Sequence, residues 1–149
     1  MRDETATSNS TPPWHLWVVG GLSLLWNAGG AFDFLMTQTR NEAYMSAFTP
    51  DQLDYFYSFP LWAVITWGGA TWGSLWGSLF LLLRRSLAVP VFITALVCLG
   101  LTTLQNFVFS DGLTLMGGVG VLIFSATIVV VAVLLVLYAR SLRARGILR

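Results

Sequence analysis

The sequence contains no lysine, a single cysteine, a single histidine and few charged residues of either sign. All eight basic residues are arginine, and charged residues make up only 10% of the 149 positions. A soluble domain carries about 25% charged residues, so this chain lacks the polar surface that would keep it in water. Its net charge of +1 gives no reason to expect a nucleic-acid partner.

The scarcity of histidine and cysteine limits the chemistry that the chain can perform. His15 alone cannot supply paired haem ligands or a multi-histidine metal site, and Cys98 alone cannot form an internal disulfide. The sequence also has no phosphate-binding loop, nucleophile elbow or pair of catalytic carboxylates. We therefore expect no catalytic residues, no metal site and no cofactor, and an enzyme is the function class with the least support.

Hydrophobic residues, by contrast, make up 56% of the chain, and the mean hydropathy is +0.72. They gather in four runs, at residues 14–36, 61–83, 87–109 and 113–137. As helices these runs are about 34 to 38 Å long, and the hydrocarbon core of a bilayer is about 30 Å thick. Backbone amides in lipid must bond within the segment, and the runs do not alternate as barrel strands do. The predicted fold is an all-α membrane protein, an antiparallel four-helix transmembrane bundle in the lipid bilayer.

The arginine positions predict how this bundle is oriented. Arg40 alone falls on one side of the predicted spans, and the other seven arginines fall in the N-terminal segment, the second connection and the C-terminal segment. The positive-inside rule assigns the side with seven arginines to the cytoplasm. We therefore predict a multi-pass protein of the bacterial inner membrane, with both ends in the cytoplasm.

The two ends of the chain differ from the apolar runs. Residues 1–13 are polar and end in two prolines, which predicts a disordered cytoplasmic tail. Residues 14–140 form the predicted transmembrane domain, and residues 141–149 form a basic cytoplasmic tail. A competing interpretation makes the first run a cleaved signal peptide, because residues 28–31 loosely resemble a cleavage site; its flanking charges and three tryptophans argue against this.

The connection between the first two runs carries the pattern of a short helix. Thr49, Pro50 and Gln52 fit an N-cap, a first helical residue and the third residue of a capping box. The aromatic residues that follow, among them Tyr55 and Phe56, are typical of the level of the lipid headgroups. We therefore expect an interfacial helix in this first outer loop.

The second run has a glycine at every fourth position: Gly69, Gly73 and Gly77. Such a row lets another backbone approach closely, and close packing drives helix association in lipid. We expect this row to pack against another helix of the same chain. The alternatives are a seam between copies in a homo-oligomer and a docking face for a partner in a membrane complex.

Polar side chains gather toward the outer ends of the first and third runs. Asp33 lies near the end of the first run, with Asn27 on a related face and Arg40 further along if the helix continues. Gln105 and Asn106 fall at nearly the same depth in the third run. Ionisable residues within a membrane usually face protein or water and indicate function. We predict that these five residues form an outward-facing polar pocket centred on Asp33; the alternative is a set of polar contacts between helices.

Several segments also resemble a known group of sequences: Leu25–Asn27, Gly30–Asp33, Thr37–Asn41 with Tyr44, Phe59–Pro60 and Trp72–Arg85. The chain resembles an uncharacterised family of small four-span bacterial inner-membrane proteins, whose members sometimes bear the label "sugar transporter". This resemblance implies a four-span membrane protein. The leading functional hypothesis is a small-solute transporter or solute-binding membrane protein, and the alternative is a non-catalytic accessory or assembly subunit of a membrane complex.

Overall fold

The computed structural model describes residues 11–149, and this part of the chain is helical with no strands. In chain order its helices are α1 (Trp14–Gln38), α2 (Glu42–Met45), α3 (Pro50–Tyr57), α4 (Leu61–Leu82), α5 (Ala88–Phe107), α6 (Gly112–Leu115) and α7 (Val119–Ala144). The tail predicted at residues 1–13 lies mostly outside the described residues, which begin at Thr11.

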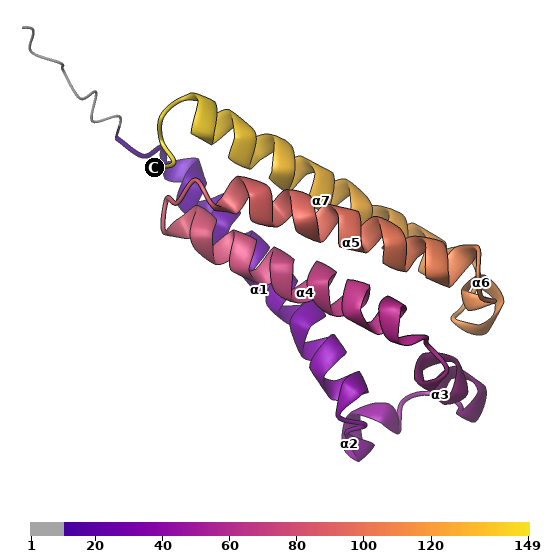
Figure 1. Ribbon diagram of the computed structural model, residues 1–149. Helices are drawn as coiled ribbons and strands as arrows, with labels where there is room; N and C mark the ends of the chain where they lie inside the picture. Colours follow the sequence, from indigo (N-terminus) through magenta and orange to yellow (C-terminus); the bar gives the residue numbers. More distant parts are fainter. Residues whose placement is uncertain (1–10) are drawn as a thin grey trace, which may run out of the picture.

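The four long helices run antiparallel in succession (Figure 1). The helix α4 packs along both α1 and α5, and α5 packs along α7. The start of α1, the connection 83–87 and the C-terminus lie at one end of the molecule, which we call the terminal end. The short helices α2, α3 and α6 lie at the other end, which we call the loop end.

Three of these helices, α1, α5 and α7, are long and apolar enough to cross a membrane. The helix α4 has 22 residues, but its four tryptophans and four glycines lower its hydropathy. The described part of the chain therefore has the character of a membrane protein, with three candidate spans by length and composition.

The fourth apolar run differs from its predicted bounds of 113–137. The backbone breaks at Gly117 and Gly118, whose φ angles are +114° and +60°, a region that glycine enters without the steric cost of a side chain. The run is consequently divided into α6 and α7, and α7 continues to Ala144. The long helix of this run therefore begins at Val119 and not at residue 113, and it ends at Ala144 and not at residue 137.

The C-terminal segment folds back onto the connection between α4 and α5. Gly146 reverses the chain with a φ of +68°. The Ser86 N–H donates to the Arg149 carbonyl at 2.7 Å, and the Arg149 N–H donates to the Arg84 carbonyl at 2.8 Å. Ile147 and Leu148 are buried, at 6% and 5% exposure. The segment predicted as a basic tail at 141–149 therefore consists of the last turn of α7 and a folded end.

The main apolar core lies in the terminal half of the molecule. It joins residues from all four long helices and the C-terminal segment: Leu16, Leu81, Ala88, Val89, Phe92, Leu135, Val136, Ala139, Leu142, Ile147 and Leu148. The helical residues of this core lie toward the terminal ends of their helices, and Ile147 and Leu148 follow the end of α7. The four long helices are therefore joined by a common core at the terminal end.

The glycine row of α4 faces α5 within the same chain. A Cβ at Gly69 would lie 2.9 Å from the Cys98 Sγ, and one at Gly77 would lie 2.6 Å from the Phe92 Cδ1. A Cβ at Gly73 would lie 3.1 Å from the Cβ of Ala95. The absence of side chains on this row is what allows α4 and α5 to approach so closely.

The capping box predicted for the first outer loop is present at the start of α3. The Thr49 hydroxyl accepts a hydrogen bond from the Gln52 N–H at 3.4 Å, and the Gln52 Oε1 accepts one from the Thr49 N–H at 3.1 Å. The amide nitrogen of Gln52 also donates to the Leu115 carbonyl at 3.1 Å. The Gln52 side chain thus caps the start of α3 and also bonds α3 to α6.

Candidate functional site

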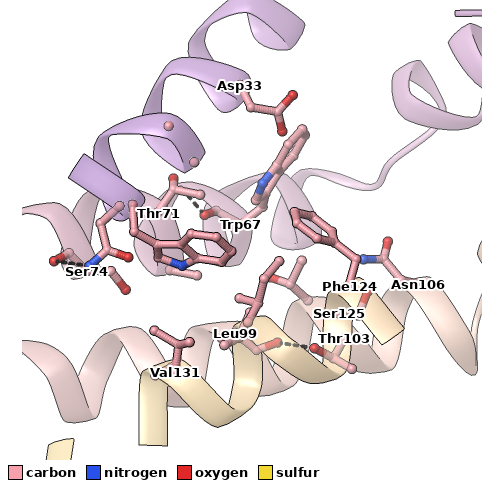
Figure 2. A pocket seen from close by; sticks show the side chains of 18 of the residues that line it. Asp33, Trp67, Thr71, Ser74, Leu99, Thr103, Asn106, Phe124, Ser125 and Val131 are labelled. Carbon is pink, nitrogen blue, oxygen red and sulfur yellow. Dashed lines mark hydrogen bonds between the residues drawn. The ribbon is translucent and has the colours of Figure 1, made fainter. Parts of the chain in front are cut away.

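A cavity of ≈ 640 Å³ lies in the loop half of the molecule, between α1 and α7 and over α4 and α5. Figure 2 shows Asp33 on one side of this space and Thr103, Ser125 and Val131 on the other. The lining also includes Trp26, Asn27, Gly29, Gly30, Tyr44, Trp67, Ala70, Thr71, Ser74, Thr102, Asn106, Phe124 and Ala132. Its volume falls in the range of about 300–1,000 Å³ that is usual for small-molecule sites.

The cavity exists because α1 and α7 separate and carry small residues where they face each other. Near the terminal end, His15 Nδ1 and the Tyr138 hydroxyl lie 2.5 Å apart and hold the two helices together. Toward the loop end, α1 turns away from α7 (Figure 1). There a Cβ added at Gly29 would meet nothing within 4 Å, and one at Gly30 would meet only Thr71 at 3.7 Å.

In the part of the chain that the structure describes, Asp33 is the only charged residue that lines the cavity. The Tyr44 hydroxyl, from the short helix α2, donates a hydrogen bond of 2.7 Å to the Asp33 Oδ1. This hydrogen bond, together with burial and the charge of the carboxylate, raises the pKa of Tyr44 to about 12. Tyr44 therefore stays protonated near neutral pH and keeps the carboxylate fixed at the cavity wall.

Arg40 does not join Asp33 in the polar pocket that the sequence predicts. The helix α1 ends at Gln38, and Arg40 adopts a φ of +51°, so it leaves the helical register that would place it on the face of Asp33. Its guanidinium lies over the ring of Tyr57, 4.3 Å from the ring centroid. Stacking on an aromatic face satisfies a guanidinium without a carboxylate, and Asp33 has no basic neighbour on the cavity wall.

Asn27 and Asn106 both line the cavity, and each also joins two elements of the fold. The Asn27 amide nitrogen donates to the Ser74 carbonyl at 3.2 Å and to the Ser78 hydroxyl at 2.9 Å, which links α1 to α4. The Asn106 Oδ1 accepts from the Tyr55 hydroxyl at 2.9 Å, which links α5 to α3. Burial raises the pKa of Tyr55, which keeps this hydroxyl a donor.

Gln105 lies apart from this group. It is buried, at 7% exposure, and is not among the residues that line the cavity. The backbone carbonyl of Gln105 accepts a hydrogen bond of 2.6 Å from the Ser110 hydroxyl, just beyond the end of α5. Of the five residues predicted to form one polar pocket, the structure thus brings Asn27, Asp33 and Asn106 to a common cavity and places Arg40 and Gln105 elsewhere.

The sequence reasoning missed Tyr44 and the hydroxyl groups of α4, α5 and α7. Tyr44 reaches Asp33 because α2 turns the chain back after α1, and the Asn41 Oδ1 caps α2 by accepting the Tyr44 N–H at 3.1 Å. The sequence Asn41–Glu42 is a helix-start signal that could have located this turn. Thr71, Thr103 and Ser125 carry no comparable signal, because hydroxyl residues are common throughout the apolar runs.

Comparison with protein-family models, with curated proteins and with solved structures finds no match. Within residues 11–149, no three side chains of the types that bind metals come together. The functional assignment therefore rests on the cavity and on the residues that line it.

Proposed function

We propose that this protein is an integral membrane protein of the bacterial inner membrane that spans the bilayer four times, with both ends in the cytoplasm. Three candidate spans are present by hydropathy, and α4 is the proposed fourth. It lies alongside α1 and α5 and joins the loop end to the terminal end (Figure 1). With 22 residues it is about 33 Å long, enough to cross a hydrocarbon core of about 30 Å.

The charges at the two ends support the proposed orientation. Arg84, Arg85, Arg140, Arg143 and Arg145 lie at the terminal end. Asp51, Asp54 and Asp111 lie at the loop end, which also holds Arg40. Since arginine is retained on the cytoplasmic side during insertion, the terminal end faces the cytoplasm and the cavity opens on the periplasmic half.

A reporter that is active only in the periplasm tests this orientation. Inserted after Asp51 it should be active, and inserted after Arg85 or Arg145 it should be inactive. Activity at either arginine site would overturn the proposed orientation.

The function that we propose is the binding of a small solute from the periplasmic side, either for its uptake or to sense it. The observation that carries this proposal is the cavity of ≈ 640 Å³ with a carboxylate on its wall. A pocket that is mainly apolar with a few converging polar groups is the usual form of a small-molecule site. The terminal half is filled by the apolar core, so transport would require the helices to separate there.

Blocking the cavity tests whether it binds solutes. Gly30→Leu places a side chain at the cavity wall, and Gly21→Leu adds the same side chain to α1 outside the cavity, where a Cβ meets nothing within 4 Å. In a thermal-shift screen of small amines, sugars and amino acids, we expect at least one solute to stabilise the wild type and Gly21→Leu but not Gly30→Leu. A screen in which no solute does this would contradict the proposal.

The accessory-subunit hypothesis depended on a free glycine face. In the structure, Gly69, Gly73 and Gly77 contact α5 of the same chain, so this row offers no surface to a partner. We therefore place solute binding ahead of it, and keep the accessory role as the outcome favoured if the cavity proves not to bind solutes.

A further inference from the structure

Several hydrogen-bond donors on the cavity wall are engaged within the protein. The Thr71 hydroxyl donates to the Trp67 carbonyl at 3.1 Å, and the Thr103 hydroxyl donates to the Leu99 carbonyl at 2.8 Å. In both cases the hydroxyl donates its proton to a backbone carbonyl of its own helix. Toward the cavity these hydroxyls present oxygen lone pairs, because a hydroxyl has one donor and two acceptor sites.

Asn27 adds to this bias in the same way. Its amide nitrogen donates to two oxygens of α4, the Ser74 carbonyl and the Ser78 hydroxyl. This use of the nitrogen leaves the carbonyl oxygen of the amide as its accepting atom. Asn27, Thr71 and Thr103 thus offer acceptors to an occupant.

Asp33 adds a formal negative charge to the same wall. Arg40, the nearest basic residue along the chain, stacks on Tyr57 instead, and no basic residue among positions 11–149 lines the cavity. Tyr44 occupies one site on the Asp33 Oδ1 with a neutral hydroxyl, which orients the carboxylate without neutralising it. Interactions between charges are strong in a medium of low dielectric constant, so a cation is the occupant that would gain most here.

Aromatic rings form much of the remaining wall. Trp26, Trp67 and Phe124 line the cavity together with Tyr44, and the rings of Trp26 and Phe124 lie 6.3 Å apart across the gap between α1 and α7. The faces of such rings attract cations, and their apolar surface favours an apolar body on the ligand.

From the uncompensated carboxylate, the aromatic rings and the acceptor oxygens of Asn27, Thr71 and Thr103, we infer that the solute is a monovalent organic cation, an amine or quaternary ammonium with an apolar body. This inference rests on the proposed function and names the ligand class of the same cavity. The positive group would sit beside Asp33, near the loop end, and the apolar body would extend between Thr71 and Val131 toward the middle of the helices.

Two probes of the same shape and different charge test the inference on the full chain in nanodiscs. Benzyltrimethylammonium is a cation, and neopentylbenzene is its neutral isostere. Calorimetric titrations, with empty nanodiscs as the reference for partition into lipid, should show the cation binding at least about tenfold more tightly than the isostere.

Three variants assign that preference to the carboxylate. Asp33→Asn should weaken cation binding by about tenfold or more, whereas Asp54→Asn, which removes a carboxylate outside the cavity, should leave it unchanged. Tyr44→Phe removes the hydrogen bond to Asp33 but keeps the charge of the carboxylate, so it should retain the preference for the cation. If Asp33→Asn fails to fold, Tyr44→Phe and the pair of probes still decide the matter.

The possible results separate this inference from the proposed function. Equal binding of the two probes to the wild type, or cation binding that is the same in Asp33→Asn, would overturn the inference. If that binding is nevertheless lost in Gly30→Leu, the cavity binds solutes of another class and the proposed function stands. Loss of the cation preference in Tyr44→Phe as well as in Asp33→Asn would also overturn the inference, because it would assign the effect to the contact between α1 and α2. If neither probe binds more than empty nanodiscs, the inference is wrong and the solute screen alone decides the function.

Discussion

Leu16, Leu81 and Phe92, in the terminal half of the molecule, are at most 3% exposed, whereas in the loop half the same helices enclose a cavity of ≈ 640 Å³. Large aliphatic residues of α7 and of the C-terminal segment fill the terminal half. In the loop half α1 turns away from α7 (Figure 1), and Gly29 and Gly30 leave open space on α1. The comparison teaches that one bundle can be filled at one end and hollow at the other, because the separation of its helices changes along its length.

A tight contact in the buried core of the terminal half should give the largest effect when it is overfilled. Gly77→Leu introduces a side chain where even a Cβ would lie 2.6 Å from buried Phe92. Overpacking of this kind costs about 1–3 kcal/mol or more, so we expect a strong loss of thermal stability in detergent. The matched control is Gly100→Leu on α5, where a Cβ meets nothing within 4 Å and little change is expected.

The same comparison extends to the centre of the row. Gly73→Leu should destabilise the protein more than Leu79→Ala, because a Cβ at Gly73 already lies 3.1 Å from that of Ala95, whereas Leu79 is only partly buried. Equal melting temperatures for these two variants would contradict the role that we give to the glycine row.

The C-terminal segment, which closes the terminal half, is tested by removing a side chain instead of adding one. Leu148→Ala removes a side chain that is 5% exposed, and truncations of buried leucine cost about 2 kcal/mol or more. Leu137→Ala, at a position that is 54% exposed, is the matched control and should cost far less. Thermal unfolding of the two variants in the same detergent measures the difference. If the two are equally stable, the folded C-terminus contributes nothing to the closed half.

The smallest effect concerns Tyr44 in the loop half and appears only at alkaline pH. Its pKa is raised from 10.0 to about 12, chiefly by the hydrogen bond to Asp33. Because the pKa is higher in the folded state, the protonated form favours folding. The contribution is complete below pH 10 and is lost as the pH rises through 12.

Tyrosinate absorbance, taken as the difference between the wild type and Tyr44→Phe, isolates this group from the other three tyrosines. In Asp33→Asn the carboxylate is absent, and the pKa of Tyr44 should fall toward 10.0. A Tyr44 that titrates at the same pH with and without Asp33 would show that the two side chains are not in contact.

Features that depend on neighbouring residues were predictable from the sequence. The capping box of α3 joins Thr49 to a residue three positions away, and it is present as expected. The first three apolar runs also form helices close to their predicted bounds, because each is a continuous apolar segment. The break at Gly117 and Gly118 was missed, since two glycines within an apolar run do not by themselves reveal a positive φ.

Of the features that depend on contacts between distant segments, the packing of the α4 glycine row on another helix was predictable, but most others were not. The fold of the C-terminus depends on backbone hydrogen bonds to Arg84 and Ser86, more than 60 positions earlier. Within the site, Asp33 was identified from its depth, but its partner depends on where α1 ends and how α2 turns. Gln105 and Asn106 are adjacent in sequence, and only the rotation of α5 against its neighbours decides that Asn106 alone reaches the cavity.

The central claim is that the cavity in the loop half admits small solutes from the periplasmic side. It is tested most directly by labelling Thr103→Cys, at the cavity wall, in a Cys98→Ala background, with Ala139→Cys in the terminal core as the control. A small membrane-impermeant methanethiosulfonate reagent is applied to spheroplasts and, separately, to inverted vesicles. We expect Thr103→Cys to react in spheroplasts only and Ala139→Cys to react in neither. Reaction of Thr103→Cys in inverted vesicles only, or in neither preparation, would contradict an outward-facing cavity.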